Sequence, residues 1–200
     1  MIAVLDYGIG NLRSAEKALA RVGADARLTD DPYVISTAAG VVLPGVGAFG
    51  RCMDALDGTG LANIARGAVT RGVPFLAICI GMQLLYDHSD ETPGRAGLGI
   101  LPGVVRRLPE GVKHPQMQWN TLDVKRDSPM FNGLPRPAWF YFVHSYAPDD
   151  ITHATATCDY GGSVVAAVER GNVWATQFHP EKSGANGMQL LANFVSRCAA

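Results

Sequence analysis

Cys79 is the residue of this sequence whose surroundings point most directly to covalent chemistry. It ends the apolar segment 73–78 (VPFLAI), and Gly81 and the helix-like MQLLY follow one residue later. This arrangement predicts a nucleophile elbow with cysteine as the nucleophile and Ala77 at the first small position. The following helix N-terminus favours a thiolate, and the Ile80 amide can bind a developing oxyanion. A small apolar cysteine packed in the core is the alternative.

His179 is the best candidate for the base that such a cysteine needs. It stands out from the other four histidines because it follows the strand-like VWATQ and belongs to a His-Pro-Glu sequence. Pro180 stiffens the turn, and the alternation of an extended chain places His179 and Glu181 on one side. A carboxylate there orients the imidazole, as in a triad. A solvated pair on a surface turn is the alternative for these two residues alone; Cys79, His179 and Glu181 together predict a catalytic triad.

Two glycine-containing loops follow predicted strands. The loop LPGVGAFG at 43–50 brings bare backbone amides close to a ligand, as the second wall of an oxyanion hole requires; a flexible connection is the alternative. Gly8-Ile9-Gly10 suggests dinucleotide binding, but Arg13 occupies the position of the third glycine of that fingerprint. A tight turn into a helix is the better interpretation of this second loop.

The elements that must position these residues alternate between strands and helices. This order predicts an α/β fold with a mostly parallel central sheet flanked by helices. In the second half, short β-type segments between Pro, Gly and Asp turns predict antiparallel additions to the sheet or its edge. The predicted strands of the first half are 2–6, 24–29, 40–45 and 73–78, and the helices are 14–23 and 61–72, with Gly23 as a C-cap; the later β segments are 103–108, 119–124, 139–147, 153–158, 163–171 and 173–178, before a closing helix at 184–198.

Composition excludes several classes of function. Seventeen basic and eighteen acidic residues give a net charge of −1, so no basic footprint for nucleic acid exists. No segment reaches the ~18 apolar residues of a membrane span. The start MIAVLDYG indicates a first strand and no signal peptide, which makes the cytoplasm the expected compartment. The four cysteines show no zinc or disulfide spacing, and we expect one domain over residues 1–200, with no metal and no cofactor.

The motifs in this order resemble the class I (triad) glutamine amidotransferases. CIGMQLL at 79–85 and the His-Pro-Glu at 179–181 carry that resemblance. Further strings are similar to the glutaminase subunits of imidazole glycerol phosphate synthase, and they span nearly the whole chain. These are DYGIGNLRS (6–14), LPGVGAFG (43–50), GLGILPG (97–103), WN (119–120), YFVHSY (141–146), CDYGG (158–162) and TQFHPEKSG (176–184).

The resemblance implies hydrolysis of L-glutamine to glutamate and ammonia. Cys79 attacks the side-chain amide, His179 transfers the proton to ammonia, and Glu181 orients His179. The oxyanion hole comprises the Ile80 amide and the loop residues Val46 and Gly47. The glutamine-binding walls are Gln83, Ser145 and Tyr146.

The resemblance also implies a heterodimer with a (β/α)8-barrel cyclase, which uses the ammonia to make imidazole glycerol phosphate and AICAR in histidine biosynthesis. The implied docking residues are Asn11, Trp119, Tyr141 and Lys182; for the two aromatics, ordinary core packing is the alternative. Residues 115–120 read PQMQWN where PHMGWN is usual, so Gln116 and Gln118 bear on the partner geometry.

Three other functions remain open at this stage. A glutaminase of another synthase, such as the pyridoxal phosphate type, has the same chemistry. A catalytically silent docking module has the same fold, although the intact Cys79, His179 and Glu181 argue against it. A cysteine hydrolase of the dienelactone type has the triad order Cys, Asp, His, which this chain does not show.

Overall fold

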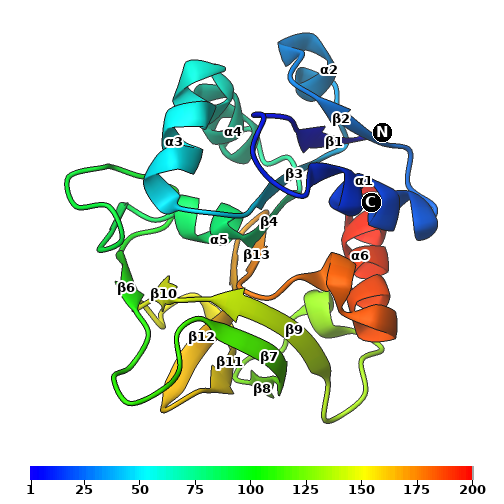
Figure 1. Cartoon of the computed structure of the whole chain (residues 1–200). Helices are drawn as coiled ribbons and strands as arrows, with labels where there is room; N and C mark the ends of the chain where they lie inside the picture. The colour runs from blue at the N-terminus through cyan, green and yellow to red at the C-terminus, as the bar shows by residue number, and fades with distance from the viewer. Residues whose placement is uncertain (200) are drawn as a thin grey trace.

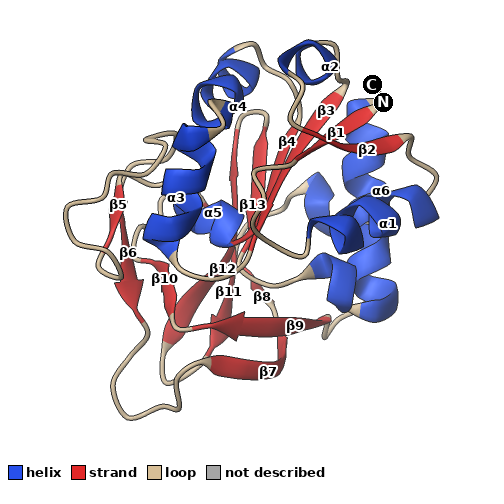
Figure 2. Cartoon of the chain, turned by 45° about the horizontal axis from the view of Figure 1, so that its top comes forward, coloured by secondary structure: helices blue, strands red, loops and turns tan. Residues whose placement is uncertain are grey.

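The computed structural model describes residues 1–199 and has an eight-stranded sheet at its centre, with helices on both faces (Figure 1, Figure 2). The strand order is β2-β1-β3-β4-β13-β12-β11-β8. The first five of these strands run parallel, and they are β2 (Ala26–Thr29), β1 (Ile2–Leu5), β3 (Gly40–Gly45), β4 (Phe75–Cys79) and β13 (Val173–Thr176). The last three add antiparallel, and they are β12 (Ser163–Arg170), β11 (Ala154–Asp159) and β8 (Asp123–Val124).

Helices cover the parallel part of the sheet from both sides (Figure 2). They are α1 (Leu12–Arg21), α2 (Pro32–Ser36), α3 (Phe49–Gly58), α4 (Leu61–Thr70), α5 (Ile80–Leu84) and α6 (Gly184–Cys198). Every residue of β1, β3, β4 and β13 is buried. Burial on both faces is the reason that these strands are nearly continuous apolar runs rather than alternating ones.

Two small sheets lie beside the antiparallel end of the molecule. One contains β10 (Tyr146–Pro148), β6 (Val104–Arg107) and β5 (His88–Ser89). The other, which we call the β7–β9 ribbon, pairs β7 (Gln116–Thr121) antiparallel with β9 (Trp139–His144). Short 3₁₀ turns, η1 (Pro129–Phe131) and η2 (Pro180–Lys182), complete the fold. The burial of β9 alternates, so the ribbon has one buried face and one face open to solvent.

The structure confirms the α/β class, the mostly parallel sheet and the antiparallel strands of the second half. It differs from the sequence-based expectation in the connections. Helix α3 was not among the helices predicted from the sequence, and its buried Phe49, Met53 and Leu56 explain why it forms. The segments 119–124 and 139–147 are each divided between two sheets. The sequence does not mark the division, because the residues on both sides of it are of the types that form strands. Within residues 1–199, no helix combines the length and the apolar character needed to cross a bilayer.

Candidate active site

Cys79 lies on a strained turn between β4 and α5. Its φ of 55° makes it the one non-glycine residue with a positive φ in the described part of the chain. Such backbone strain occurs mostly at functional sites. The turn is tight because a Cβ on Gly81 would stand 2.0 Å from the Leu43 carbonyl oxygen, so only glycine lets α5 approach β3 this closely. The elbow predicted from the sequence is present, although the strand extends to Cys79 itself.

His179 and Glu181 form a buried pair beside this turn. His179 Nδ1 lies 2.7 Å from Glu181 Oε1, and the two side chains are 1% and 4% exposed. The reason given from the sequence is wrong in one respect: Pro180–Lys182 is a 3₁₀ turn and not an extended segment, so the turn rather than strand alternation brings the carboxylate to the imidazole. The solvated surface pair is excluded by the burial.

The protonation of His179 reflects its two neighbours. Burial alone lowers the pKa of His179, but the interactions with the side chains of Cys79 and Glu181 outweigh it and raise the pKa to about 9. His179 Nε2 is buried and has no hydrogen-bond partner within the structure. The Glu181 carboxylate, bonded to Nδ1, and the neighbouring Cys79 therefore both favour the protonated imidazole. This is the arrangement of a cysteine nucleophile paired with its base.

A chain of buried amides reaches Cys79 from a different direction. Gln83 Nε2 donates to the Tyr146 carbonyl (2.8 Å) and to Gln177 Oε1 (3.1 Å). Since the Gln177 oxygen accepts from Gln83, its amide nitrogen faces Cys79 Sγ, at 3.8 Å. The thiol also lies 3.9 Å from the Val143 carbonyl oxygen, with Val143 on β9. The centre of the main sheet and the β7–β9 ribbon therefore meet at this sulfur atom.

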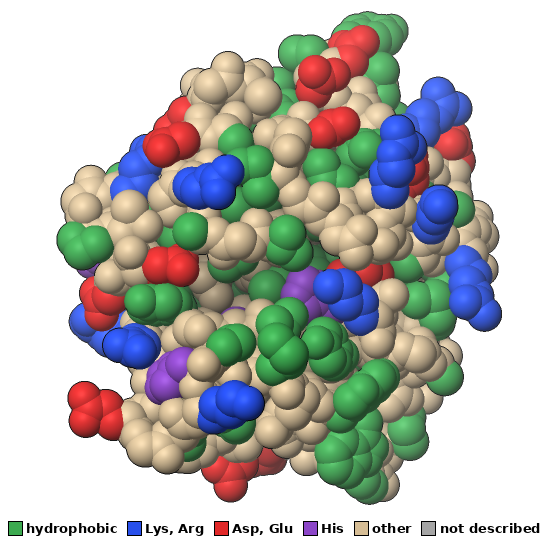
Figure 3. All heavy atoms as spheres, viewed as in Figure 1, with side chains coloured by type: hydrophobic (Ala, Val, Ile, Leu, Met, Phe, Trp, Pro, Cys, Tyr) green, Lys and Arg blue, Asp and Glu red, His purple; other side chains and the backbone are tan. Residues whose placement is uncertain are grey.

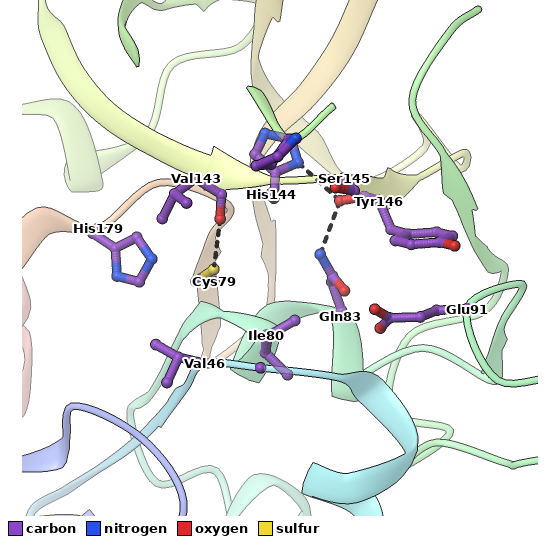
Figure 4. Close-up of a pocket in the computed structure, with 12 residues that line it drawn as sticks. Val46, Cys79, Ile80, Gln83, Glu91, Val143, His144, Ser145, Tyr146 and His179 are labelled. Carbon is purple, nitrogen blue, oxygen red and sulfur yellow. Dashed lines mark hydrogen bonds between the residues drawn. The ribbon is translucent and has the colours of Figure 1, made fainter. Parts of the chain in front are cut away.

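Cys79 and His179 open onto a cavity of about 240 Å³ (Figure 4). Val143 and His144 lie along one side of it, and Val46 and Ile80 lie on the opposite side (Figure 4). The described lining residues are Val46, Gly47, Cys79, Ile80, Gln83, Glu91, Pro115, Val143, His144, Ser145, Tyr146 and His179. The volume suits a small, polar ligand of amino-acid size better than a dinucleotide.

The structure brings together the residues predicted for the triad, the oxyanion hole and the glutamine walls. Glu181 alone among them does not line the cavity; it stands behind His179. Gln83 lines the cavity, but its amide nitrogen is already occupied by Tyr146 and Gln177, which leaves its buried Oε1 without a partner. Gln83 can therefore only accept from a ligand.

Three residues of the site were not predicted from the sequence as site residues. Glu91 brings a carboxylate to the cavity wall, held by a hydrogen bond from the Phe49 amide (2.8 Å), and no local pattern marks it. His144 and Gln177 lie within recognised strings, but their side-chain roles were not assigned. For Gln177 a signal existed, because a separation of two residues from His179 places both on one side of an extended chain.

The residues predicted for docking lie on the surface, away from the cavity lining. Trp119 and Tyr141 are cross-strand partners in the β7–β9 ribbon, with ring centroids 6.1 Å apart, and Trp119 is 49% exposed. Core packing is excluded for Trp119. Asn11 and Lys182 are exposed at the start of α1 and in η2. Figure 3 shows this face, with hydrophobic and basic side chains around a hollow in which a histidine is visible.

Comparison with known proteins identifies the family of this chain. Residues 3–198 match the family described as "Glutamine amidotransferase class-I". Solved structures share the fold, among them a crystal structure of glutamine amidotransferase (TM-score 0.79, 21% identity, covering 100% of this chain and 99% of that one). A second is PurLQS from Thermotoga maritima (TM-score 0.76, 20% identity, 98% and 97% covered).

Two relatives are much more similar in sequence. Imidazole glycerol phosphate synthase subunit HisH of Syntrophotalea carbinolica is 49% identical over 97% of this chain and 98% of its own length. The subunit of the same name from Methanothermobacter thermautotrophicus is 48% identical, with 98% of each chain covered. Sequence identity of 48–49% over nearly the whole of both chains shows a common family, whereas the solved structures at 20–21% identity show only a common fold. The chain belongs to the class-I glutamine amidotransferases and, within them, to the HisH family of imidazole glycerol phosphate synthase subunits.

Proposed function

We propose that this chain hydrolyses L-glutamine through Cys79, His179 and Glu181 and delivers the ammonia to the cyclase of imidazole glycerol phosphate synthase. The observation that carries the proposal is the buried His179–Glu181 pair, at 2.7 Å, opening onto the same cavity as the strained Cys79. Burying a charged pair costs free energy, because both groups lose their contact with water, and a catalytically silent docking module has no need of such a pair. The HisH relatives favour this synthase over another glutamine-dependent one.

The reaction proceeds by covalent catalysis. His179 takes the proton of the Cys79 thiol, the sulfur forms a bond to the side-chain carbonyl carbon of glutamine, and the carbonyl electron pair moves onto oxygen. Amides of Ile80 and of the Val46–Gly47 loop receive the oxyanion. The carbon–nitrogen bond then breaks as His179 gives its proton to the departing ammonia, which leaves a glutamyl thioester. Water, deprotonated by His179, attacks the thioester, the carbon–sulfur bond breaks to release glutamate, and the protonated His179 returns its proton to the Cys79 sulfur.

The cavity offers complementary groups for the amino-acid end of the substrate. The Glu91 carboxylate and the unpartnered Gln83 Oε1 are acceptors, and an α-ammonium group supplies the donors that both need. Ser145 and Tyr146 form the wall next to them. A substrate held there by its ammonium points its side-chain amide toward Cys79, at the other end of the cavity (Figure 4).

The outer face of the β7–β9 ribbon is the surface that we assign to the cyclase, which we propose to be a (β/α)8 barrel. Met117 and Trp119 are 63% and 49% exposed there, more apolar surface than a small strand pair normally leaves in water. Tyr141 links this face to the site, because its carbonyl accepts from the His179 amide (3.0 Å) and its amide donates to Ser183 Oγ (3.0 Å). A partner bound here thus touches the strand that holds His179.

We propose the cytoplasm as the compartment. The four cysteines are all free thiols in the structure, and three of them are buried. Free thiols persist where the environment is reducing, as in the cytosol.

Replacing Cys79 tests the proposed function directly. In the complex with the cyclase, Cys79→Ala is expected to abolish glutamate release and glutamine-dependent synthesis of imidazole glycerol phosphate. Synthesis from added ammonium salt is expected to stay at the wild-type rate, because the cyclase needs only ammonia. Loss of both activities would show that Cys79 is structural, and retained glutamine-dependent synthesis would refute its role as nucleophile.

A further inference from the structure

Two buried side chains outside the cavity hold the glycine-rich loop from behind. The Tyr7 hydroxyl donates to the Pro44 carbonyl oxygen at 2.7 Å. The Cys52 thiol donates to the Val46 carbonyl oxygen at 3.4 Å. Tyr7 follows β1 and Cys52 lies on α3, and their exposed fractions are 2% and 0%. Neither side chain lines the cavity.

Both groups keep their protons at neutral pH and so remain hydrogen-bond donors. Burial raises the pKa of the Cys52 thiol to about 11, and it raises the pKa of Tyr7 well above its ordinary value of 10. Each of the two groups also contributes to the pKa shift of the other. Two protonated donors therefore act on two carbonyls of one loop, those of Pro44 and Val46.

The hydrogen bond from Cys52 sets the direction of a peptide group. In a planar trans peptide the carbonyl and the following N–H point in opposite directions. The Val46 carbonyl is turned toward Cys52 in the protein interior, so the Gly47 N–H is turned away from that interior. Val46 and Gly47 are both in the cavity wall, and Gly47 has a φ of 99°, a conformation that glycine adopts readily.

The contact with Tyr7 fixes the start of the same loop. A Cβ added to Gly45 would stand 2.8 Å from the Tyr7 hydroxyl oxygen and 2.9 Å from the amide nitrogen of Gly81. Gly45 is therefore held between Tyr7 and the turn that carries Cys79. The loop is located against the nucleophile by Tyr7, and its following peptide is oriented by Cys52.

We propose that Tyr7 and Cys52 are positioning residues of the oxyanion hole, which hold the Pro44–Gly47 backbone so that its amide faces the developing oxyanion. This inference rests on the proposed function, since it requires the loop to serve an acyl transfer at Cys79. The competing explanation is that both side chains only fill space. The two explanations differ in whether the donated hydrogen or the shape of the side chain matters.

Variants that change the donor while keeping the shape distinguish them. Tyr7→Phe removes only the hydroxyl, Cys52→Val fills the thiol volume without a donor, and Cys52→Ser restores a donor. Cys158→Val is the matched control, because Cys158 is equally buried but lies on β11 and contacts Gln116 instead of the loop. All four are prepared in complex with the cyclase, and kcat and KM are measured by glutamate release, together with the melting temperature.

A second measurement isolates the oxyanion. Iodoacetamide alkylates Cys79 by displacing iodide from a saturated carbon, so this reaction needs the thiolate but develops no oxyanion. Its rate is read from the mass of the peptide that contains residue 79. A defect confined to the oxyanion hole lowers kcat and leaves the alkylation rate unchanged, whereas a general disturbance of the site lowers both.

We expect Tyr7→Phe and Cys52→Val each to lower kcat by about 10-fold or more, with KM and the alkylation rate within about 2-fold of wild type. Cys52→Ser recovers kcat to within about 3-fold, and Cys158→Val stays at the wild-type value. Wild-type kcat in both donor-free variants, no advantage of serine over valine, or a parallel fall of kcat and alkylation would overturn the inference. An inactive wild-type complex would instead overturn the proposed function, and the inference with it.

Discussion

Two histidines face the same cavity from different regions of the molecule, and their protonation is opposite. His179 follows β13 of the parallel sheet, and its pKa is raised to about 9. His144 ends β9 of the ribbon, and burial lowers its pKa to about 4. The two are buried to nearly the same degree, with 1% and 5% of their surface exposed. Burial alone therefore does not decide which histidine carries charge.

The difference comes from the partner of each ring. His179 Nδ1 meets the Glu181 carboxylate at 2.7 Å, and a full negative charge offsets the loss of hydration. His144 Nδ1 meets the Tyr146 carbonyl at 2.8 Å, a neutral dipole that cannot do so, and the nearby His179 lowers its pKa further. The parallel region supplies an imidazole that can give a proton, and the ribbon supplies one that stays neutral as part of the cavity wall.

Glu181→Gln breaks this contrast and has the largest expected effect. Without the carboxylate, the pKa of His179 moves down toward that of His144, and glutamine no longer holds the imidazolium. We expect kcat for glutamate release to fall by about 10³- to 10⁴-fold, as for triads that lose their third member. Steady-state kinetics of the complex and an NMR titration of His179 are the measurements. A variant with near wild-type kcat would show that Glu181 is dispensable.

The residues that the sequence could predict are those that belong to short local motifs. Cys79 was found because a nucleophile elbow is local: strand, cysteine, Gly81 and helix follow one another within a few residues. His179 and Glu181 were found because their motif is compact, although the turn that joins them was taken for extended chain. Continuous apolar runs likewise predicted the buried parallel strands.

What could not be predicted depends on the tertiary arrangement. Glu91 reaches the cavity only because the segment after β5 folds back against α3, where the Phe49 amide holds it. Gln116 and His144 are buried by strand pairing within the ribbon, which no local pattern specifies. The division of 139–147 between two sheets is decided by partners that are distant in sequence, at β6 and β7. Long-range pairing, rather than local propensity, set these outcomes.

The second prediction compares the two histidines through the pH dependence of the free energy of unfolding. A pKa raised from 6.5 to about 9 means that His179 stabilises the fold fully below pH 6.5, and this contribution is lost as the pH rises through 9. The buried side chain is 1% exposed, so the contribution is on the order of 3 kcal/mol. The difference in free energy of unfolding between wild type and His179→Asn should shrink by this amount from pH 6 to pH 10.

His144 predicts the opposite limb of the profile. Its pKa of about 4 means that its contribution is present above pH 6.5 and is lost as the pH falls toward 4. His144→Gln should therefore flatten the acid limb and leave the alkaline limb unchanged. Urea unfolding under reducing conditions at several pH values measures both variants. Identical profiles for the two variants would refute the assigned charges, and titrating groups that do not interact with the replaced histidine cancel in the differences.

The smallest expected effect concerns the outer face of the β7–β9 ribbon and its affinity for the cyclase. Trp119→Ala removes an exposed aromatic that the fold does not need, so we expect an unchanged melting temperature and cyclase affinity about 30-fold weaker, near 2 kcal/mol. Tyr33→Ala is the matched control, since Tyr33 is an aromatic 76% exposed on α2. Lys182→Ala should slow association mainly at low salt, because an exposed charge steers encounter more than it holds the complex. Calorimetry and stopped-flow binding read these effects. Equal losses for Trp119→Ala and Tyr33→Ala would show that the ribbon is not the docking surface, and its apolar face would then need another explanation.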